Sequence, residues 1–543
     1  MQKHDGVETK KGMSRRRFLS VMAGAGVVGA AATMTGCSPV SDPSGTGWLP
    51  NQYRNASEMP AQVKGRVPLD PDNVALIRND EKCILCGQCI EACEKVQSVF
   101  GYYELPVHDE FICVHCGQCA LWCPTGAIKE RSEIEKVQNA INDTNKIVIV
   151  HTAPATRVGF GEEFGAEAGA WAEGQQIDAL RKLGFDYVLD TNWSADLTIM
   201  EEGSELVHRI TNGGVLPQFT SCCPGWVKFV EYYYPDLIPN LSSAKSPTMM
   251  HGATIKTYMA EKLMAQGVIQ SPAQIYNVAI MPCTAKKFEI DREEFNDAGK
   301  YWLEEGKEWG SEDMRDMDAV LTVRELADMT RNAGIQYGDL DPNAQYDPIE
   351  GIGSTAGLIF GNTGGVMEAA VRSAYKLITG NEPPAGLFEL TEVRGLKGIK
   401  KATLNIPGVG DVTVAVASGL ANARKLCEDV RHGRADFQFM EIMSCPGGCI
   451  AGGGQPRTTV PPQDWVRQAR IDTVYERDAA GIINAANTEV GKTLKLATSH
   501  ENPEILTIYE EFLGEPLSDK AHHLCHTHGY HSRAEALTAK EVQ

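Results

Sequence analysis

The pattern of apolar and polar residues changes several times along the chain. Short continuous apolar runs at 147–150 and 187–189 predict buried strands. Longer stretches at 195–211 and 248–265 have the length and the mixed pattern of helices. Alternating strands and helices predict an α/β region with parallel sheets. From about residue 464 the chain becomes charged and helical in pattern.

The first forty residues have the pattern of an export signal. Residues 14–19 (SRRRFL) form a twin-arginine pattern, and the Gly/Ala-rich run that follows is too short and too weakly apolar to span a bilayer. We therefore predict that residues 1–37 are a twin-arginine signal for the periplasm rather than a nonspecific basic patch. Cys37 ends a lipobox-like MTGC sequence, so a lipid anchor there and simple cleavage nearby both stay open. Residues 38–64, rich in Ser, Pro, Gly and Asn, are predicted to be a linker.

Composition narrows the class of protein. The chain has 543 residues, 43 % of them hydrophobic, which indicates several globular domains rather than a disordered or fibrous protein. Its formal charge of −20 makes nucleic acid a poor partner and a basic protein a better one. Sixteen cysteines are too many to be incidental, and their spacing has to decide between disulfides and metal.

Eight of the cysteines repeat one spacing twice, with gaps of two, two and three residues and the sequence CxxCGQC in both copies. This is the spacing of bacterial ferredoxins with two clusters: three thiolates surround one cubane and the fourth reaches the other. The predicted ligands are Cys83, Cys86, Cys89 and Cys123 for one [4Fe–4S] cluster, and Cys113, Cys116, Cys119 and Cys93 for the other. The duplication argues against a disulfide-bridged scaffold. Two such clusters conduct single electrons, so a catalytic centre is expected elsewhere.

A second cysteine set is spread over three peptides, 220–226 (TSCCPGW), 281–287 (MPCTAKK) and 443–449 (MSCPGGC). Each follows a predicted strand end and precedes a helix or a glycine-rich loop, which is where open α/β sheets bind ligands. Pro224 suits the first position of a helix, whose N-terminus stabilises a thiolate at Cys223. The spacing predicts a third cluster held by Cys223, Cys283, Cys445 and Cys449. Buried structural thiols beside tight turns are the alternative.

These three peptides resemble the signature motifs of [FeFe]-hydrogenases, and the eight-cysteine block resembles the electron-entry domain of that family. The resemblance covers nearly the whole chain from about residue 65. It implies an H-cluster, in which a [4Fe–4S] cubane is joined through one cysteine sulfur to a two-iron subcluster with carbonyl, cyanide and azadithiolate ligands. It also implies that Cys223, Cys283 and Cys445 hold the cubane and that Cys449 bridges it to the subcluster.

The resemblance assigns further roles around this centre. Cys222 corresponds to the free thiol that donates protons to the azadithiolate amine, and Lys286 to the lysine that hydrogen-bonds a cyanide ligand. Met281 and Met443 correspond to methionines that line the pocket, although ordinary core packing explains a methionine equally well. The peptide at residues 153–154, Ala153 and Pro154, corresponds to a loop beside the two-iron site.

A proton path is implied by the same resemblance. Glu202 and Glu205 are three residues apart and can share one helical face, and with Ser242 they match the route from Cys222 to water. Arg209 corresponds to the outer end of this path, and Glu289, six residues after Cys283, to a position near the site with an unclear role; we group both with the outer path. A solvated helix face is the alternative.

Residues 464–543 resemble the small subunit of two-subunit exported [FeFe]-hydrogenases, here fused to the C-terminus. The peptides that carry this weaker match are 502–512, 514–517 and 526–529. The run His522, His523, Cys525, His526, His528 and His531 has a spacing that can bind zinc, but the small-subunit pattern explains it without a metal. Cys427 and Cys525 stay unassigned, as buried or incidental thiols.

Together these observations predict a multidomain α+β and α/β protein. A two-cluster ferredoxin domain (65–138) precedes a two-lobed α/β H-cluster domain (139–463) and a helical C-terminal wrap (464–543). The implied function is reversible oxidation of dihydrogen, mainly uptake, with electrons passed through two [4Fe–4S] clusters to a basic c-type multihaem cytochrome or a ferredoxin. Maturation proteins are implied as further partners. A hydrogen sensor, an iron–sulfur scaffold protein of the same superfamily and a plain ferredoxin-type carrier are the alternatives, and no nucleotide or flavin motif occurs after a strand.

Overall fold

The structure is a computed structural model and describes residues 65–99, 111–483 and 494–537. The twin-arginine pattern, Cys37 and the predicted linker lie outside the described residues. In the described part, no helix is both long enough and apolar enough to cross a membrane.

The first large sheet has four parallel strands in the order β4-β3-β6-β7. These strands are β3 (Ile147–Thr152), β4 (Tyr187–Asp190), β6 (Ile275–Met281) and β7 (Ala319–Thr322). Their side chains are almost all buried, as expected for a parallel sheet that is covered on both faces. Helices α5 (Glu173–Leu183) and α12 (Val323–Asn332) pack their apolar faces into the same core. The strands predicted at 147–150 and 187–189 are confirmed.

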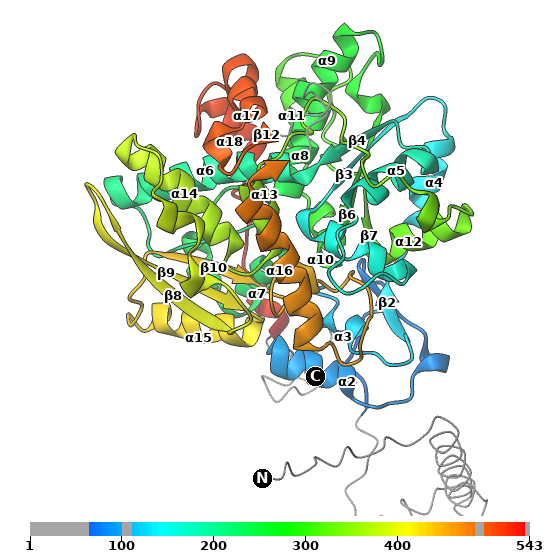
Figure 1. Cartoon of the computed structure of the whole chain (residues 1–543), viewed down its shortest axis with the longest axis horizontal. Helices are drawn as coiled ribbons and strands as arrows, with labels where there is room; N and C mark the ends of the chain where they lie inside the picture. The colour runs from blue at the N-terminus through cyan, green and yellow to red at the C-terminus, as the bar shows by residue number, and fades with distance from the viewer. Residues whose placement is uncertain (1–64, 100–110, 484–493, 538–543) are drawn as a thin grey trace, which may run out of the picture. The chain divides into compact units, whose positions relative to one another are not determined.

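The second large sheet has the order β5-β10-β9-β8; strands β10, β9 and β8 are labelled in Figure 1. Its strands are β5 (Gln218–Phe219), β10 (Phe439–Met443), β9 (Gly410–Ser418) and β8 (Ile399–Ile406). Strands β5, β10 and β9 are parallel, whereas β8 joins the edge as an antiparallel partner of β9. Burial roughly alternates along β8 because one face of this edge strand meets solvent. The predicted mixed α/β class with parallel sheets is therefore confirmed.

Two long helical stretches lie at 191–212 and 247–265. Helix α6 (Thr191–Asn212) begins directly after β4, where the Asp190 carboxylate caps it by accepting the Asn192 N–H. It packs against α14 (Gly365–Thr379) and ends at Gly213, which has a left-handed φ of 83°. The helix predicted at 248–265 forms as α8 (Pro247–Thr254), a π-turn η7 (Ile255–Met259) and α9 (Ala260–Ala265), so a local widening interrupts it.

The eight-cysteine segment has a backbone that repeats itself. Short helices α2 (Gln88–Glu91) and α3 (Gln118–Leu121) each follow a glycine in the left-handed region, Gly87 at φ 74° and Gly117 at φ 72°. Two residues before these glycines, Leu85 and His115 also have positive φ, 54° and 59°. Equal strain at equivalent positions is what a duplicated sequence should produce. Strands β1 (Leu76–Arg78) and β2 (Ile128–Glu130) pair antiparallel beside these loops.

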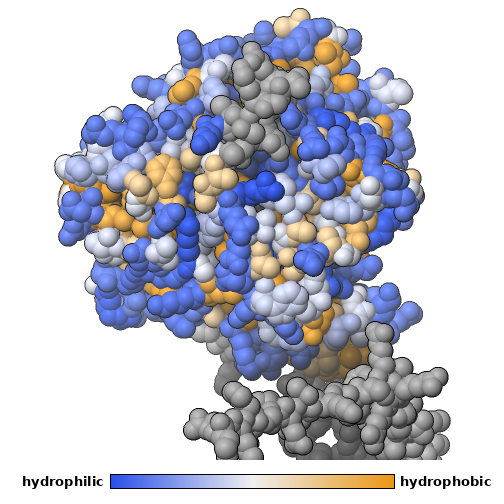
Figure 2. Space-filling model, in the orientation of Figure 1, coloured by the Kyte–Doolittle hydropathy of each residue, from blue (hydrophilic) through white to orange (hydrophobic). Residues whose placement is uncertain are grey.

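The C-terminal segment is largely helical, and its last part, from residue 503 onward, packs against the α8–α9 region. Its helices are α16 (Asp464–Ala480), α17 (Pro503–Ile508), the π-turn η15 (Tyr509–Leu513) and α18 (Asp519–Cys525), drawn in orange and red in Figure 1. Apolar side chains from α17, η15 and α18 share one core with those of α8 and α9. Figure 2 shows mainly hydrophilic residues, with scattered apolar ones, on the coloured part of the face it presents.

Candidate active site

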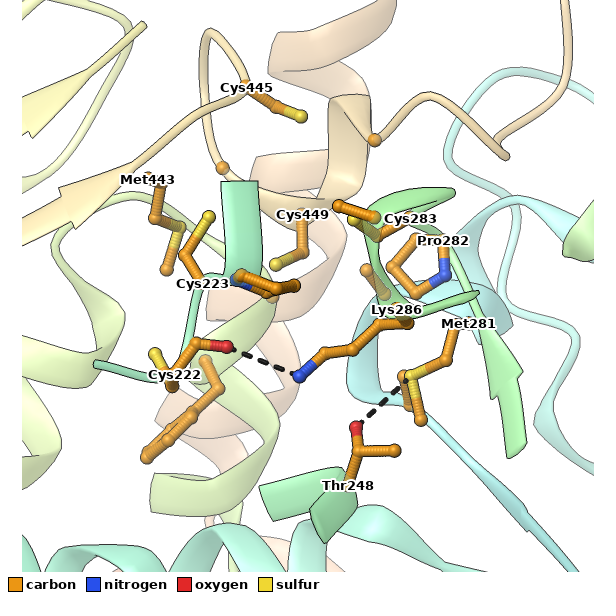
Figure 3. A pocket seen from close by; sticks show the side chains of 18 of the residues that line it. Cys222, Cys223, Thr248, Met281, Pro282, Cys283, Lys286, Met443, Cys445 and Cys449 are labelled. Carbon is orange, nitrogen blue, oxygen red and sulfur yellow. Dashed lines mark hydrogen bonds between the residues drawn. The ribbon is translucent and has the colours of Figure 1, made fainter. Parts of the chain in front are cut away.

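Cysteines from both large sheets meet in one pocket of about 80 Å³ (Figure 3). Cys222 and Cys223 follow β5, Cys283 follows β6, and Cys445 and Cys449 follow β10, so each of these five cysteines comes from the carboxyl end of a parallel strand. This is the edge at which open α/β sheets bind ligands. The pocket is otherwise lined mainly by apolar groups, among them the predicted residues Met281, Met443, Ala153 and Pro154. The structure thus brings the second cysteine set together.

Local structure holds Cys223 where a thiolate is stabilised. Cys223 caps helix α7 (Pro224–Tyr233), and Pro224 occupies its first turn, as the sequence predicts. The sulfur lies 3.1 Å from the Ser444 hydroxyl and 3.4 Å from the Ser444 backbone N–H. Both groups and the positive end of the helix favour negative charge on this sulfur.

The other pocket thiols are held away from water and close to one another. Burial raises the pKa of Cys283 to about 12, and the nearby Cys223 adds to the rise. Burial also raises the pKa values of Cys445 and Cys449 far above the usual range, again with contributions from neighbouring cysteines. Converging thiols of this kind cannot ionise together unless a cation compensates them, which bound iron does. The residues present therefore fit a cysteine-ligated iron cluster.

The glycines before Cys449 let the backbone come close to the pocket. Gly448 has φ 104° and ψ −163°, a conformation that is essentially restricted to glycine. A Cβ atom there would lie 2.5 Å from the Thr363 backbone nitrogen. Only glycine can therefore place Cys449 at this point of the loop.

Lys286, in the peptide 281–287, reaches across the pocket to the peptide 220–226 (Figure 3). Its ammonium donates to the Cys222 backbone carbonyl at 3.2 Å and to the Glu289 carboxylate at 2.7 Å. Ser246 donates to the same carboxylate oxygen of Glu289 at 3.0 Å. Glu289 is thus the counter-ion of Lys286 and orients it, and it does not contact Arg209.

The predicted proton-path residues lie on helix α6 and at Ser242, and hydrogen bonds join three of them, Ser242, Glu205 and Arg209. The Ser242 hydroxyl donates to Glu205 at 2.6 Å, and Arg209 pairs with Glu205 at 2.6 Å. Glu202 is fully buried, and its carboxyl oxygens have no hydrogen-bond partner within the described residues. Burial, aided by the nearby Glu205, raises the pKa of Glu202 to about 8. Glu202 also perturbs the thiol of Cys222, so the two groups are neighbours.

The eight N-terminal cysteines fall into the two predicted sets. A small cavity is lined by Cys83, Cys86, Cys89 and Cys123, so the last cysteine of the second repeat has crossed to the first. Electrostatic coupling in the other set joins Cys116 and Cys119 to Cys113 and Cys93. Every cysteine that the structure describes is free of disulfide bonds. Cys427 and Cys525 are fully buried elsewhere.

Contacts between the eight-cysteine segment and the pocket were not predicted from the sequence. Cys116 itself lines the catalytic pocket. A Cβ on Gly453 would lie 2.3 Å from the Cys116 carbonyl oxygen and 2.5 Å from the Gly117 Cα. The Thr284 hydroxyl, next to Cys283, donates to the His115 carbonyl at 2.6 Å. The three glycines at 452–454 indicate a close backbone contact, but the sequence does not identify the segment that they contact.

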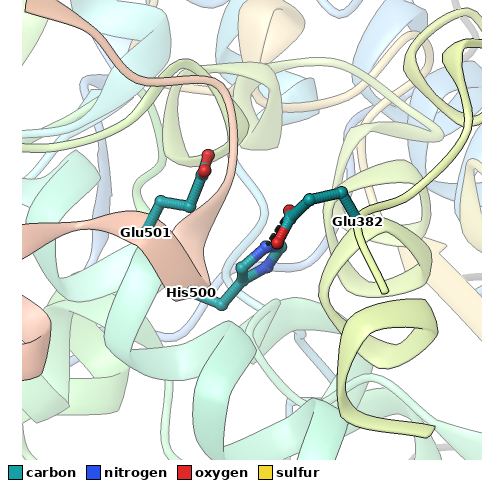
Figure 4. A group of neighbouring side chains, drawn as sticks. All are labelled: Glu382, His500 and Glu501. Carbon is teal, nitrogen blue, oxygen red and sulfur yellow. Dashed lines mark hydrogen bonds and ion pairs between the residues drawn. The ribbon is translucent and has the colours of Figure 1, made fainter. Parts of the chain in front are cut away.

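The C-terminal histidines do not converge on a metal site. His526 bonds Ser243 at 2.8 Å and Glu201 at 2.9 Å, and His523 contacts the Asp297 carbonyl at 3.2 Å. In the described ranges, the group with suitable ligand spacing is instead Glu382, His500 and Glu501 (Figure 4).

That group already has partners. His500 uses one ring nitrogen on Ser373 and the other on Glu382, and Lys376 forms an ion pair with Glu382. These bonds account for the cluster as surface ion pairing.

Fold and pocket together define a class of protein. An α/β protein that brings four cysteines and a free thiol into one mainly apolar pocket, beside a segment with eight closely spaced cysteines, has the arrangement of an iron–sulfur redox enzyme.

Comparisons identify the family. The model described as "Iron only hydrogenase large subunit, C-terminal domain" matches residues 146–453, and the one described as "Iron hydrogenase small subunit" matches residues 464–533. The chain belongs to the [FeFe]-hydrogenases, which are oxidoreductases that act on hydrogen and contain an H-cluster and iron–sulfur clusters.

Individual relatives agree with this assignment. The chain is 44 % identical to the periplasmic [Fe] hydrogenase large subunit of Nitratidesulfovibrio vulgaris over 71 % of its own length and 88 % of the relative. It is 40 % identical to the NADP-reducing hydrogenase subunit HndD of Solidesulfovibrio fructosivorans, over 84 % of this chain and 74 % of the relative. The solved [FeFe]-hydrogenase HydA1 from Chlamydomonas reinhardtii matches with a TM-score of 0.60 at 39 % identity, covering 74 % and 99 % of the two chains. Protein NAR1 of Arabidopsis thaliana is more distant, at 26 % identity over 79 % of this chain and 86 % of the relative.

Proposed function

We propose that the chain is an exported, single-chain [FeFe]-hydrogenase that interconverts dihydrogen with two protons and two electrons, mainly in the direction of uptake. The observation that carries this proposal is the convergence of four cysteines on one mainly apolar pocket, beside the free thiol of Cys222. Cys223, Cys283 and Cys445 would hold the cubane of the H-cluster, and Cys449 would bridge it to the two-iron subcluster. When bound, this cofactor supplies low-spin iron with an open site for heterolysis of dihydrogen.

The chain's own residues orient the site and move the proton. Lys286, fixed by Glu289, directs an ammonium into the pocket, where it can hydrogen-bond a cyanide ligand. Met281 and Met443 exclude water from the pocket walls, with the Thr248 hydroxyl 3.6 Å from the Met281 sulfur. During uptake, the Cys222 thiol gives its proton toward Glu202, and its sulfur takes up the proton formed in the pocket. In the opposite direction, the same groups move the proton back.

Beyond Glu202, the proton passes to Ser242 and Glu205. Arg209 closes the outer end, where its guanidinium also holds the carbonyls of Pro239, Asn240 and Leu241. Removal of this cation would leave Glu205 without its ion-pair partner.

Electrons are proposed to leave through two [4Fe–4S] clusters in a ferredoxin domain at 65–138. The set of Cys93, Cys113, Cys116 and Cys119 adjoins the pocket, because Cys116 lines it. The set of Cys83, Cys86, Cys89 and Cys123 opens next to the exposed side chains of Ile84 and Leu85. An electron-carrier protein, a basic c-type multihaem cytochrome or a ferredoxin, would dock there. The charge of −20 supports a basic partner.

The remaining assignments follow from the same proposal. A two-lobed H-cluster domain would occupy 139–463 and a small-subunit-like wrap 464–543. Export to the periplasm rests on residues 14–19 and agrees with the name of the Nitratidesulfovibrio relative. Cys37 would serve as a lipid anchor if the signal is processed as in a lipoprotein. Maturation proteins would load the cofactor before the folded chain is exported.

Film electrochemistry tests the proposal directly. The maturase-loaded full chain, adsorbed on an electrode under dihydrogen, should give an oxidation current, with a smaller evolution current when the potential is lowered under argon. A sensor or an iron–sulfur scaffold would give no catalytic current in either direction.

A further inference from the structure

A second line of polar residues leaves the catalytic pocket at Thr191. Thr191 lines the pocket, and its hydroxyl lies 2.7 Å from Nδ1 of His151, a fully buried residue of β3. The other ring nitrogen of His151 lies 3.5 Å from the Met317 sulfur, which can only accept. Nε2 therefore carries the hydrogen, and Nδ1 accepts the Thr191 hydroxyl.

His251 continues the line from helix α8. Its ring centroid is 4.5 Å from that of His151, and its Nε2 lies 3.5 Å from a carboxyl oxygen of Glu350. The Thr254 hydroxyl donates to that oxygen at 2.8 Å. Within the described residues, neither nitrogen of His251 nor the other oxygen of Glu350 has a hydrogen-bond partner, although both side chains are fully buried. Buried polar atoms are nearly always partnered, so three together require a reason.

The backbone at Glu350 is strained in a way that maintains this placement. Ile349 and Glu350 have φ values of 71° and 60°, which are rare for residues other than glycine and costly for a β-branched residue. Glu504 of the C-terminal segment stabilises the turn by accepting the N–H groups of Ile349, Gly351 and Ile352 at 3.2, 3.0 and 2.9 Å. The small-subunit-like segment thus imposes the conformation that turns Glu350 inward.

A cavity of about 170 Å³ adjoins the outer end of the line. It is lined by Trp193, Tyr258, Lys262, Pro348, Ile349, Glu350, Glu504 and Thr507. Pro348 is exposed and Lys262 is partly exposed, so the cavity lies at the surface. Its volume is enough for several water molecules, each of which takes about 30 Å³ in the liquid.

The groups along the line are uncharged near neutral pH. Burial lowers the pKa of His151 to about 3, with Lys286 adding to the shift, and it also lowers the pKa of His251. Burial raises the pKa of Glu350 far above its usual range, and Glu504 adds to that rise while Lys262 opposes it. A neutral acid next to neutral imidazoles can exchange protons without leaving a buried charge behind.

We propose that Thr191, His151, His251 and Glu350 form a second proton relay, which joins the catalytic pocket to the surface cavity independently of Glu202 and Glu205. The relay rests on the proposed hydrogenase function. During uptake, the Cys222 thiol passes a proton to the Thr191 hydroxyl, which passes its own to Nδ1 of His151. Nε2 of the same ring then gives up the hydrogen that faces the Met317 sulfur, and the neighbouring ring of His251 takes it. Glu350 gives its own proton to water in the cavity and accepts the one from His251. Each group loses one proton for each that it gains.

If two proton routes work in parallel, blocking one should matter more when the other is already blocked. A residue with only a structural role should have the same effect in both backgrounds. We compare His251→Phe and Glu350→Gln in the unmodified full chain and in a Glu202→Gln background, all loaded with cofactor. Each should lower turnover less than about threefold alone, but about tenfold in the Glu202→Gln background, with a larger solvent isotope effect. Equal factors in both backgrounds, or no turnover at all in Glu202→Gln, would overturn the relay.

Tyr258→Phe is the matched control, because Tyr258 lines the same cavity while its hydroxyl bonds Glu511 at 2.9 Å. It should change turnover equally in both backgrounds.

Infrared spectroscopy gives a readout that does not depend on turnover. The protonated Glu350 carboxyl should give a C=O band that shifts within seconds of mixing with D2O and is absent in Glu350→Gln. If Glu350→Gln removes no such band, or if the band fails to shift, the relay is wrong even for an active enzyme. If turnover is absent in the unmodified chain while the Glu350 band behaves as expected, the hydrogenase proposal has failed instead.

Discussion

The eight-cysteine segment and the catalytic pocket bring their cysteines together in opposite ways. In the segment, each set of three cysteines sits within seven residues of chain, and its loops repeat one strained backbone at Leu85 and His115. In the pocket, the cysteines lie at 223, 283, 445 and 449 and meet only when two separate sheets are in place. Short spacing therefore determines the first kind of site, whereas the whole fold determines the second. A substitution in the eight-cysteine segment should therefore affect electron transfer, whereas a substitution in the pocket should affect the reaction with dihydrogen.

The largest contrast comes from removing one cysteine in each region. Cys283→Ala removes a cluster ligand from the centre of the pocket, so hydrogen-dependent reduction of a viologen dye should be lost entirely. Cys86→Ala, the matched variant in the eight-cysteine segment, should retain dye reduction while reduction of a protein carrier fails. Substantial dye reduction by Cys283→Ala would refute the ligand assignment.

Cys222→Ser separates proton transfer from cofactor binding within the pocket. A serine hydroxyl is a far poorer acid than a thiol, so turnover should fall by about 10²–10⁴-fold, the usual contribution of a general acid or base. The infrared bands of the bound cofactor should persist. Cys427→Ala, which removes a buried thiol remote from the pocket, is the control and should retain turnover. Survival of turnover in Cys222→Ser would show that another group handles the proton.

Gly453→Ala tests the contact between the two regions. The added methyl group would meet backbone atoms of Cys116 and Gly117 at 2.3–2.5 Å, so the segments must move apart. We expect a loss of about 1–3 kcal/mol in stability, typical of overpacking. Electron current should fall several-fold, while hydrogen–deuterium exchange, which needs no external electrons, falls less. Gly386→Ala is the control, because a Cβ there meets nothing within 4 Å. Equal losses in both activities would mean that the contact shapes the pocket rather than the electron route.

The smallest effect concerns pH. Burial raises the pKa of Glu202 to about 8 in the folded chain, against 4.5 for a solvent-exposed glutamate side chain. Between these values the folded state binds more protons than the unfolded state, so this contribution to stability is complete below pH 4.5 and declines as pH rises toward 8. Denaturant midpoints measured from pH 5 to 8 should therefore fall less in Glu202→Gln than in the unmodified chain. Parallel pH profiles would indicate that Glu202 is ionised in the folded protein.

The sequence predicts those features of the fold and the site that depend on residues close together in the chain. Cysteine spacing alone suggested two N-terminal sets, which stay a prediction as cluster ligands, although Cys83, Cys86, Cys89 and Cys123 do line one cavity. Pro224 predicted the start of α7. The contact of Gly453 with Gly117 could not be predicted, because it joins residues more than 300 positions apart. His151, His251 and Glu350 were missed for the same reason: each looks like an isolated buried residue until the sheet, α8 and a strained loop bring them together.

The central claim is that the pocket of Cys223, Cys283, Cys445 and Cys449 holds the H-cluster. Infrared spectroscopy of the full chain, produced with its maturation proteins and purified without oxygen, tests it most directly. We expect carbonyl and cyanide stretching bands that respond to dihydrogen and are absent from Cys283→Ala. A chain that contains iron and sulfide but shows none of these bands would contradict the claim and indicate an iron–sulfur protein without hydrogenase chemistry.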